Sequence, residues 1–536
     1  QQNMSQVSSA GSPDASALSK AADYYRGGFD GVWGGTRGAM KFPSALPIRL
    51  LLRVYRRTRQ EDLLRMATLT LDRMAAGGMH DQVGGGFHRY STDPEWLVPH
   101  FEKMLYDNAL LAMDYLETYQ VTGEKGYADI AREILRYVER DMTSPEGAFY
   151  CATDADSPAP SGRREEGWFF TWTPDEMEWA LGPERARILE AWFGVTPKGN
   201  FEGRNILHTE RSMPEVAKAL GLPVGKLRAT IEESREILYD ARRKRPPPLR
   251  DEKILTAWNG LMISAYARAA LVLGEGRYAE RASKAARFLL AKLRTVGRLS
   301  RSFKDGRASH GAYLDDYAFL VAGLLDLFEA TGDARWLREA ISLDRVLEAH
   351  YEDKQGGGFF LTSDDDERLL ARERPSYDGA EPSGTSVQIL NLLRLHELTS
   401  NEAYRRRAEN ALASLGGILQ KAPAALSEAL LAVDFATCKA KEIVIVTRRS
   451  RDEAEPLLAR LRMTFLPNRV LLVVPEGQPL RDLARAAPLV EGKVAARGQP
   501  TAYVCKRGVC DLPTSDPAVF EKQIRQADPL LVTPRE

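Results

Sequence analysis

The feature that most constrains the fold is a motif that recurs along the chain. Each copy has a short turn that contains glycine or threonine, then an aromatic residue, then an alanine four positions later. Residues 122–131 match residues 331–340 in this way, and shorter copies begin at Gly274 and Thr399. A helix, a tight turn, an aromatic residue that packs on the turn and a second helix make one unit. The sequence therefore predicts a chain built of helical hairpins.

Apolar residues at helical spacing predict six such hairpins. The expected helix pairs are 43–58 with 60–75, 99–121 with 125–140, 174–193 with 213–242, 256–273 with 276–294, 313–330 with 333–350, and 383–399 with 402–420. Repeats of this kind can bury their apolar faces by closing into an (α/α)6 toroid of inner and outer helices. An open solenoid is the alternative. We favour closure because acidic and glycine-rich segments follow the second helix of several hairpins, which places them together at one end of a ring.

The pattern changes near Glu442, where short apolar runs begin to alternate with helical segments. The runs are 443–446, 470–474 and 501–505. This alternation is typical of a small α/β unit with parallel strands. The fold class is therefore mainly α, a toroid followed by a small α/β domain. The expected divisions are a disordered lead-in at 1–20, the toroid at 21–436 and the α/β domain at 437–536.

Composition excludes several classes of function. Lys+Arg and Asp+Glu both number 74, so the bulk charge indicates neither nucleic acid nor an anionic membrane as a partner. No apolar run reaches the roughly 18 residues of a membrane span. Four cysteines in so long a chain, together with the lack of a signal-peptide pattern, favour a reducing, cytoplasmic location.

We expect no metal and no cofactor. The sequence has neither a Gly-x-Gly-x-x-Gly motif nor a P-loop, so nucleotide binding has no support. The acidic run 364–366 lacks the ordered ligand spacing of a calcium loop and is interpreted as a solvated turn. Cys505 and Cys510 could be a metal or redox pair, and we interpret them as inert thiols because further ligands are absent nearby.

The stretch 80–108 concentrates groups that carry chemistry. It holds three of the seven histidines, His80, His88 and His100. Pro99 sets a helical φ and lacks an N–H that a first turn would leave unpaired, so a helix is predicted from about residue 99. Residues seven apart then share a face, and Asp107 would point the same way as His100.

Other polar groups fall at the beginnings of predicted inner helices or in the loops before them, where a ring would bring them to one pocket. Carboxylates, amides and aromatic rings suit a polyhydroxylated ligand, because they hydrogen-bond to hydroxyls and stack on sugar rings. Asp and Ser near helix starts are also common N-caps, so capping is the alternative for each one. The substrate-binding candidates are Asp81, Arg89, Tyr90, Asp154, Asp251, Trp258, Asn259, Asp315, Asp378 and Glu381.

Six long motifs closely resemble a known family. They are residues 84–90, 96–108, 199–203, 256–263, 315–319 and 501–505. The chain is similar, from about residue 25 to its end, to the thioredoxin-domain-containing family that includes bacterial YyaL and spermatogenesis-associated protein 20. The resemblance implies a six-hairpin glycosidase-like toroid related in fold to sugar 2-epimerases. It also implies a thioredoxin-like domain that is absent from this chain, which makes such a domain an expected partner.

The leading hypothesis is a carbohydrate-active enzyme that binds a sugar or glycan at one mouth of the toroid. In an epimerase or isomerase, His80, His88 or His100 would move the proton beside the carbonyl, since imidazole titrates near neutral pH. In a glycoside hydrolase, two carboxyl groups must flank the bond. The carboxyl candidates are Glu102, Asp107, Asp156 and Asp316. The alternative from another class is a non-catalytic glycan- or peptide-binding module, or a scaffold for a separate thioredoxin-like domain.

Overall fold

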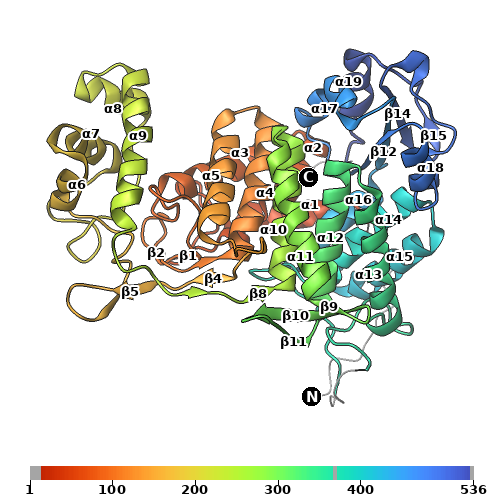
Figure 1. The fold of residues 1–536 in the computed structure, drawn as a ribbon, viewed down its shortest axis with the longest axis horizontal. Coiled ribbons are helices and arrows are strands. Elements are labelled where there is room, and N and C mark those ends of the chain that lie inside the picture. The colour runs from red at the N-terminus through yellow and green to blue at the C-terminus, as the bar shows by residue number, and fades with distance from the viewer. Residues whose placement is uncertain (1–13, 366–370, 531–536) are drawn as a thin grey trace.

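The structure is a computed structural model that describes residues 14–365 and 371–530 (Figure 1). Most of the chain is helical. The helices that build the main body are α1 (Ser16–Gly28), α2 (Ile48–Thr58), α3 (Glu61–Ala76), α4 (Leu105–Thr122), α5 (Lys125–Asp141), α10 (Thr256–Leu273), α11 (Gly276–Lys292), α12 (Leu314–Thr331), α13 (Ala334–His350), α14 (Gly384–Thr399), α15 (Glu402–Lys421) and α16 (Ala429–Thr437).

Six of these helices close into a ring. Helix α2 packs on α4, α4 on α10, α10 on α12, α12 on α14, α14 on α16, and α16 packs back on α2. Five outer helices, α3, α5, α11, α13 and α15, each pack on the inner helix that precedes them in the chain. The predicted (α/α)6 toroid is therefore confirmed, and the open solenoid is excluded.

The sixth hairpin is not the one that the sequence predicts. It consists of α16 and α1, and α1 contacts both α16 and α2. The two ends of the toroid thus join to complete the ring. The prediction of a disordered segment at 1–20 is wrong from Ser16 onward, because Leu18, Ala21, Ala22 and Tyr25 form a buried helical stripe. Residues 1–13 lie outside the described residues.

The predicted pair 174–193 with 213–242 instead folds as a separate four-helix insertion. Its helices are α6 (Pro174–Leu181), α7 (Pro183–Phe193), α8 (Met213–Leu220) and α9 (Val224–Arg242). They have their own apolar core, which includes Trp172, Phe193 and Leu238, and they stand to one side of the ring in Figure 1. Both segments are helical, but Gly182 and Gly221 each end a first short helix, so each predicted helix is divided into two, and the pair does not belong to the ring.

The recurring turn has a simple conformational cause. Gly123, Gly274 and Gly332 end their helices with φ between 72° and 75°, in the left-handed region that glycine adopts without strain. Ser400 takes the same place in the fourth copy with φ 56°. Each turn therefore reverses the chain within a few residues, and the next helix can pack back on the one before it.

The inner helices begin at one mouth of the ring, where short strands pair just before three of them, α4, α10 and α12. These strands are β1 (Tyr90–Ser91), β2 (Pro99–His100), β3 (Lys103–Met104), β4 (Ala152–Thr153), β5 (Asp156–Pro158), β6 (Arg164–Glu166), β7 (Arg250–Asp251), β8 (Ile254–Leu255), β9 (Arg294–Thr295), β10 (Arg298–Lys304) and β11 (Arg307–Gly311). Strand β3 leads into α4 and β8 leads into α10, while the β10–β11 hairpin pairs with β8 and precedes α12. This mouth therefore has a rigid rim.

The C-terminal part is a small α/β unit whose sheet has the order β13-β12-β14-β15. Its elements are β12 (Lys441–Thr447), α17 (Glu455–Arg462), β13 (Arg469–Pro475), α18 (Gln478–Ala484), β14 (Thr501–Lys506), β15 (Val509–Cys510) and α19 (Pro517–Arg525). Strands β12 and β13 are parallel, as predicted, but β14 is antiparallel to β12. Val444 and Leu472 belong to the same apolar core as the ring, whereas Ile443 and Val504 pack with α17 and α19 on the other face.

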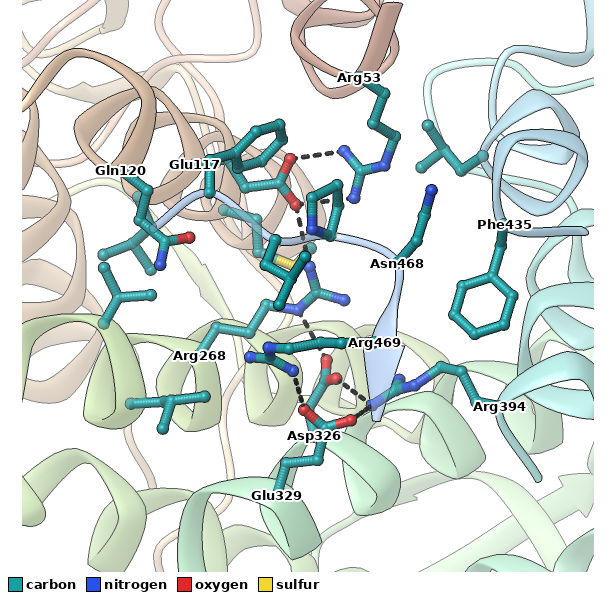
Figure 2. Close-up of a pocket in the computed structure, with 18 of the residues that line it drawn as sticks. Arg53, Glu117, Gln120, Arg268, Asp326, Glu329, Arg394, Phe435, Asn468 and Arg469 are labelled. Carbon is teal, nitrogen blue, oxygen red and sulfur yellow. Dashed lines mark hydrogen bonds and ion pairs between the residues drawn. The ribbon is translucent and has the colours of Figure 1, made fainter. Parts of the chain in front are cut away.

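The C-terminal unit closes the second end of the ring with residues 465–469 (Figure 2). Beneath this segment, ion pairs join the inner helices: Arg53 with Glu117 at 2.6 Å, and Asp326 with both Arg268 and Arg394 at 2.8 Å. Paired charges thus line the interior of the ring at this end, around a cavity of about 80 Å³. Among residues 14–365 and 371–530, no helix combines the length and apolar character needed to cross a membrane.

Candidate functional site

The chain does not become helical at Pro99, so that prediction is wrong. Pro99 and His100 form β2 and pair with β1, and α4 begins only at Leu105. The backbone N–H of Arg89 also bonds to the carbonyl of Glu102 at 2.9 Å, which holds this segment extended. Strand pairing outweighs the local preference for a helix here. His100 therefore does not share a helix face with Asp107.

Two aromatic rings and a carboxyl group meet at the mouth. Tyr106 on α4 and Trp258 on α10 pack edge to face with their ring centroids 4.9 Å apart. The Trp258 indole N–H donates to Glu381 Oε2 at 2.6 Å, so the loop before α14 is held against α10. Burial raises the pKa of Glu381 to about 7, and the nearby Asp315 carboxyl adds to this effect. Near neutral pH, Glu381 can therefore act as an acid or a base.

Asp107 lies in the first turn of α4, beside Tyr106. Its side chain is buried, and burial raises its pKa well above the usual range despite the nearby Arg89. The Glu381 and Glu102 carboxyls act in the same direction as burial. Asp107 Oδ2 has no hydrogen-bond partner within the described residues. It lines a pocket whose other walls are residues 43–50, 110–114, 378–382 and 427–431.

His100 lies at the rim of the same mouth, between two carboxylates. Its Nδ1 is 2.7 Å from Glu166 Oε1, and its Nε2 is 3.4 Å from Glu102 Oε2. Arg89 Nη1 lies 3.0 Å from the same Glu102 oxygen. The Tyr90 ring lies beside His100, tilted by 30°, with the ring centroids 5.1 Å apart. The mouth therefore joins an imidazole, a guanidinium and two carboxylates on one partly exposed surface.

Asp316 is close to this group but serves the fold. Its carboxylate accepts hydrogen bonds from the backbone N–H of Ala257 at 3.0 Å and of Tyr313 at 2.8 Å, so it caps α12 and ties it to α10. Arg301 lies 3.4 Å away. Burial raises the pKa of Asp316 to about 7. Asp315 is likewise a backbone acceptor, and it receives the N–H of Gly384 at 2.7 Å.

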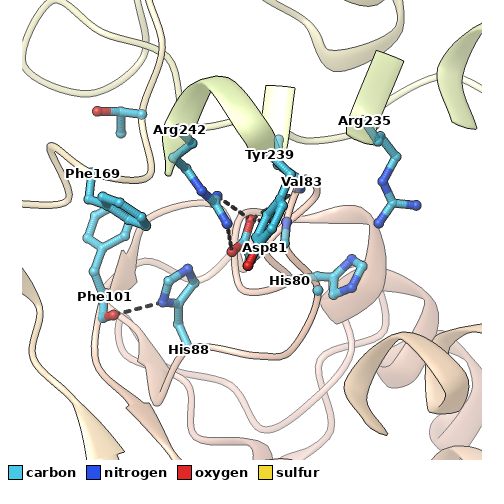
Figure 3. A network of polar contacts seen from close by, with 12 residues as sticks. His80, Asp81, Val83, His88, Phe101, Phe169, Arg235, Tyr239 and Arg242 are labelled. Carbon is cyan, nitrogen blue, oxygen red and sulfur yellow. Dashed lines mark hydrogen bonds and ion pairs between the residues drawn. The ribbon is translucent and has the colours of Figure 1, made fainter. Parts of the chain in front are cut away.

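Asp81 lies away from the mouth, at the junction between the ring and the insertion (Figure 3). Both of its oxygens are 2.8 Å from Arg242 of α9, and Lys103 Nζ is 2.7 Å from Oδ2. Burial alone would raise the pKa of Asp81, but Arg242 and Lys103 hold it well below the usual range. Burial also lowers the pKa of Lys103 to about 8. Asp81 is therefore a buried structural charge.

His80 and His88 lie at the same junction. Ring Nδ1 of His88 bonds to the Phe101 carbonyl at 2.9 Å, as Figure 3 shows, and the side chain is buried. Burial and the Lys103 charge lower the pKa of His88 to about 3. His80 Nε2 is 3.3 Å from Glu133 of α5. The structure thus separates these two histidines from the mouth, where His100 remains.

The other candidate residues hydrogen-bond to the backbone or lie opposite charged side chains near the surface. Asn259 accepts from the Phe149 N–H at 2.8 Å and donates to the Phe149 carbonyl at 2.9 Å. Asp378 accepts from the N–H groups of Ser383 at 2.8 Å and Glu428 at 2.9 Å, so it joins the beginnings of α14 and α16. The remaining pairs are Asp154 with Arg164 at 2.9 Å, Asp156 opposite Glu166 across β5 and β6, and Asp251 with Lys253 at 3.1 Å.

The acidic run near residue 364 lies outside the mouth cluster. His350, Asp364 and Asp365 present ligand atoms within 4.8 Å of one another on the surface. These charges are already paired, since Arg298 binds Asp365 at 2.9 Å and His350 binds Asp364 at 2.8 Å. Asp366, the third member of the run, lies outside the described residues.

Three residues of the mouth were missed by sequence reasoning. Tyr106 lies inside a recognised motif and could have been named with Trp258. Glu166 belongs to a charged insertion that pairs as β5 and β6, and its contact with His100 spans 66 positions. Arg301 lies on β10, which carries no motif. Local patterns cannot reveal such long-range contacts.

The chain is similar to animal proteins along most of its length. It is 37% identical over 531 residues to spermatogenesis-associated protein 20 of Homo sapiens, which covers 92% of this chain and 67% of the human protein. The protein of the same name from Rattus norvegicus is 34% identical over 535 residues, with coverage of 93% and 68%. No protein-family model matches the chain.

Solved structures with a similar arrangement include a GH76 alpha-mannanase of Bacteroides thetaiotaomicron. That match has a TM-score of 0.44 and 11% identity, and it covers 78% of this chain and 95% of that one. A sugar epimerase from a ruminal bacterium matches with a TM-score of 0.33 and 15% identity, and it covers 76% and 97%.

Proposed function

The chain belongs to the spermatogenesis-associated protein 20 family, and we propose that it is a carbohydrate-active enzyme whose sugar binds at the mouth of the toroid. The supporting observation is the group of Tyr106, Trp258 and Glu381. Aromatic rings stack on the apolar faces of sugars, and a carboxyl group that exchanges its proton near neutral pH can serve in acid–base catalysis.

The reaction best supported is hydrolysis of a glycosidic bond. Such a reaction needs one carboxyl group that is protonated and a second that is ionised. Glu381 supplies the proton to the leaving oxygen, because burial raises its pKa to about 7. Glu102, which is paired with Arg89 and His100, is the second carboxylate. Asp107 Oδ2, which is buried and has no hydrogen-bond partner among the described residues, would bind a sugar hydroxyl.

A second candidate is proton transfer beside a sugar carbonyl. It is favoured by His100, an imidazole held between Glu102 and Glu166 at the same mouth. In this reaction His100 would remove the proton at C2 and return it, as in epimerisation or isomerisation. The two candidates place different residues in the central role, so variants can distinguish them.

The test is a panel of aryl glycosides, oligosaccharides and free aldoses and ketoses, incubated in D2O and followed by NMR. For hydrolysis, Glu381→Gln should lower kcat by at least about 100-fold with little change in KM, since general acid catalysis contributes about 10²–10⁴. For epimerisation, deuterium should enter at C2 and His100→Asn should abolish it. Glu491→Gln, at an exposed position of the C-terminal unit, is the control. Sugar binding without either reaction would overturn the enzyme proposal and leave a binding module.

A further inference from the structure

The hairpin formed by β14 and β15 carries the disulfide Cys505–Cys510. The expectation of two inert thiols is therefore wrong. The two residues stand directly opposite each other in the antiparallel pair, which brings their sulfurs together. The other two cysteines, Cys151 and Cys438, are buried and unpaired. One disulfide at one hairpin is not a general framework, so this bond needs its own explanation.

The hairpin does not depend on this bond for its shape. Its turn is the two-residue type that matches strand twist, with Arg507 at φ 51° and Gly508 at φ 77°. The two cysteines are only five positions apart, and in the chain-entropy account such short loops gain the least stability from a disulfide. A structural staple is thus a poor explanation for the bond.

The two sulfurs differ sharply in access. Cys505 is 1% exposed and lies on β14, inside the sheet. Cys510 is exposed on β15, the edge strand. Val509 is 76% exposed and Leu512 is 86% exposed on either side of it. An incoming thiolate can therefore reach one sulfur only, and it arrives beside an uncovered apolar pair on an open strand edge.

A carboxyl pair lies behind the buried sulfur. Glu442 on β12 is the cross-strand partner of Cys505, so their side chains share one face of the sheet. Glu397 of α14 approaches the same point, and burial together with the Glu442 charge raises the pKa of Glu397 to about 8. The Glu397 carboxyl therefore carries a proton near neutral pH. A proton source is thus placed beside Cys505.

We propose that Cys505 and Cys510 form a redox-active pair that exchanges electrons with a dithiol protein docked on Val509, Leu512 and the β15 edge. The thiolate of that protein attacks Cys510 Sγ, the Cys505–Cys510 bond breaks, and a mixed disulfide forms at Cys510. Cys505 leaves as a thiolate and takes the proton of the Glu397 carboxyl. The second thiol of the partner then attacks the mixed disulfide and releases Cys510, so two electrons pass to this chain and the partner leaves oxidised.

The test uses the full chain and thioredoxin as the dithiol probe. Thioredoxin with its second active-site cysteine replaced by serine should become trapped on Cys510, as located by peptide mass spectrometry. With intact thioredoxin, the double variant Val509→Asp, Leu512→Asp should be reduced at least about 10-fold more slowly than wild type. Reduction by dithiothreitol should stay within about twofold, because a small dithiol needs no docking surface.

Val519→Asp provides the matched control. Val519 is an exposed valine on α19 of the same unit, 42% exposed, and its replacement should leave both rates unchanged. Circular dichroism checks that every variant and the reduced chain remain folded. Trapping on Cys505, equal slowing of thioredoxin and dithiothreitol in the double variant, or unfolding of the C-terminal unit on reduction would each overturn the proposal.

Discussion

At the scale of single residues, the junction between ring and insertion depends on charges that are matched and buried. Asp81 is held by Arg242 and Lys103, and His88 lies beside them as a neutral ring. Leaving such a group without its partner costs more than the pair itself contributes, because an uncompensated charge stays in the interior. The stability of this junction should therefore depend on pH through His88, which must remain neutral.

Because of His88, the folded state should be less stable in mild acid. Its pKa is about 3 in the folded chain, against about 6.5 in the unfolded chain, so below pH 6.5 the unfolded state binds the proton and the folded state does not. Stability is then lost as the pH falls. Between pH 6.5 and 5, wild type should lose about 1.5 kcal/mol more unfolding free energy than His88→Gln, measured by urea titration. His310→Gln, at an exposed site on β11, should follow wild type. Equal slopes for His88→Gln and wild type would contradict the assignment.

At the scale of elements, the same contact between an asparagine side chain and a phenylalanine backbone recurs in two hairpins. Asn108 of α4 accepts from the N–H of Phe87 at 2.8 Å and donates to its carbonyl at 3.1 Å. Asn259 of α10 does the same with Phe149. Each amide thereby fixes a glycine-aromatic loop onto the first turn of the inner helix that follows.

Replacing either amide should destabilise the fold to a similar degree. Asn108→Ala and Asn259→Ala each leave a buried N–H and a buried carbonyl without a partner, which should lower the unfolding free energy by about 2–4 kcal/mol. Asn401→Ala removes only the exposed cap of α15 and should cost about 1 kcal/mol. Chemical denaturation measures all three. If Asn259→Ala kept full stability and lost turnover of sugars, Asn259 would be a substrate contact.

The sequence predicted most ring helices to within a few residues, because their apolar periodicity and their turn signals agree. The beginning of α12 was expected at residue 313 and lies at Leu314, and α13 ends at His350 as expected. The failures have a common cause. Residues 16–20 became helical because α16, more than 400 positions away, covers α1, and Pro99 stayed extended because β1 pairs with β2.

The site was predictable only in part, for the same reason. Trp258, Glu381, Asp107 and His100 were named from motifs and from the beginnings of helices, and they lie at one mouth. Asp81 lies in a similar motif, but its partner Arg242 belongs to α9 of the insertion. Asp81 therefore lies at the junction with the insertion and not at the mouth. A local sequence pattern indicates the chemical type of a side chain. Its neighbours depend on contacts across the fold.

At the scale of the whole molecule, the ring and the C-terminal unit share one apolar core, whereas the insertion has its own. The interface also contains ion pairs, because Glu329 of α12 binds both Arg394 and Arg469. These elements should therefore lose their structure together. The insertion, which is attached at its base, forms a second cooperative unit.

Calorimetry should resolve these units. The ring and the C-terminal unit should melt in one transition, and α6–α9 should contribute a smaller one. Glu329→Gln removes a buried charge between Arg394 and Arg469, and it should lower the midpoint of the main transition, with a cost of about 3–5 kcal/mol. Glu491→Gln should leave both midpoints in place. A C-terminal unit that melts separately at its own temperature would refute the shared core.

Because α1 and α16 close the ring together, the order in which the ribosome synthesises the helices affects the folding of this protein. Residues 429–437 emerge more than 400 positions after the helix they cover. Throughout that interval the growing polypeptide exposes apolar flanks of α1 and α2, and from residue 384 onward also of α14, that α16 covers in the folded chain. Chaperones should therefore bind the nascent chain until α16 has been synthesised. A stop codon placed before residue 429 should yield an insoluble product.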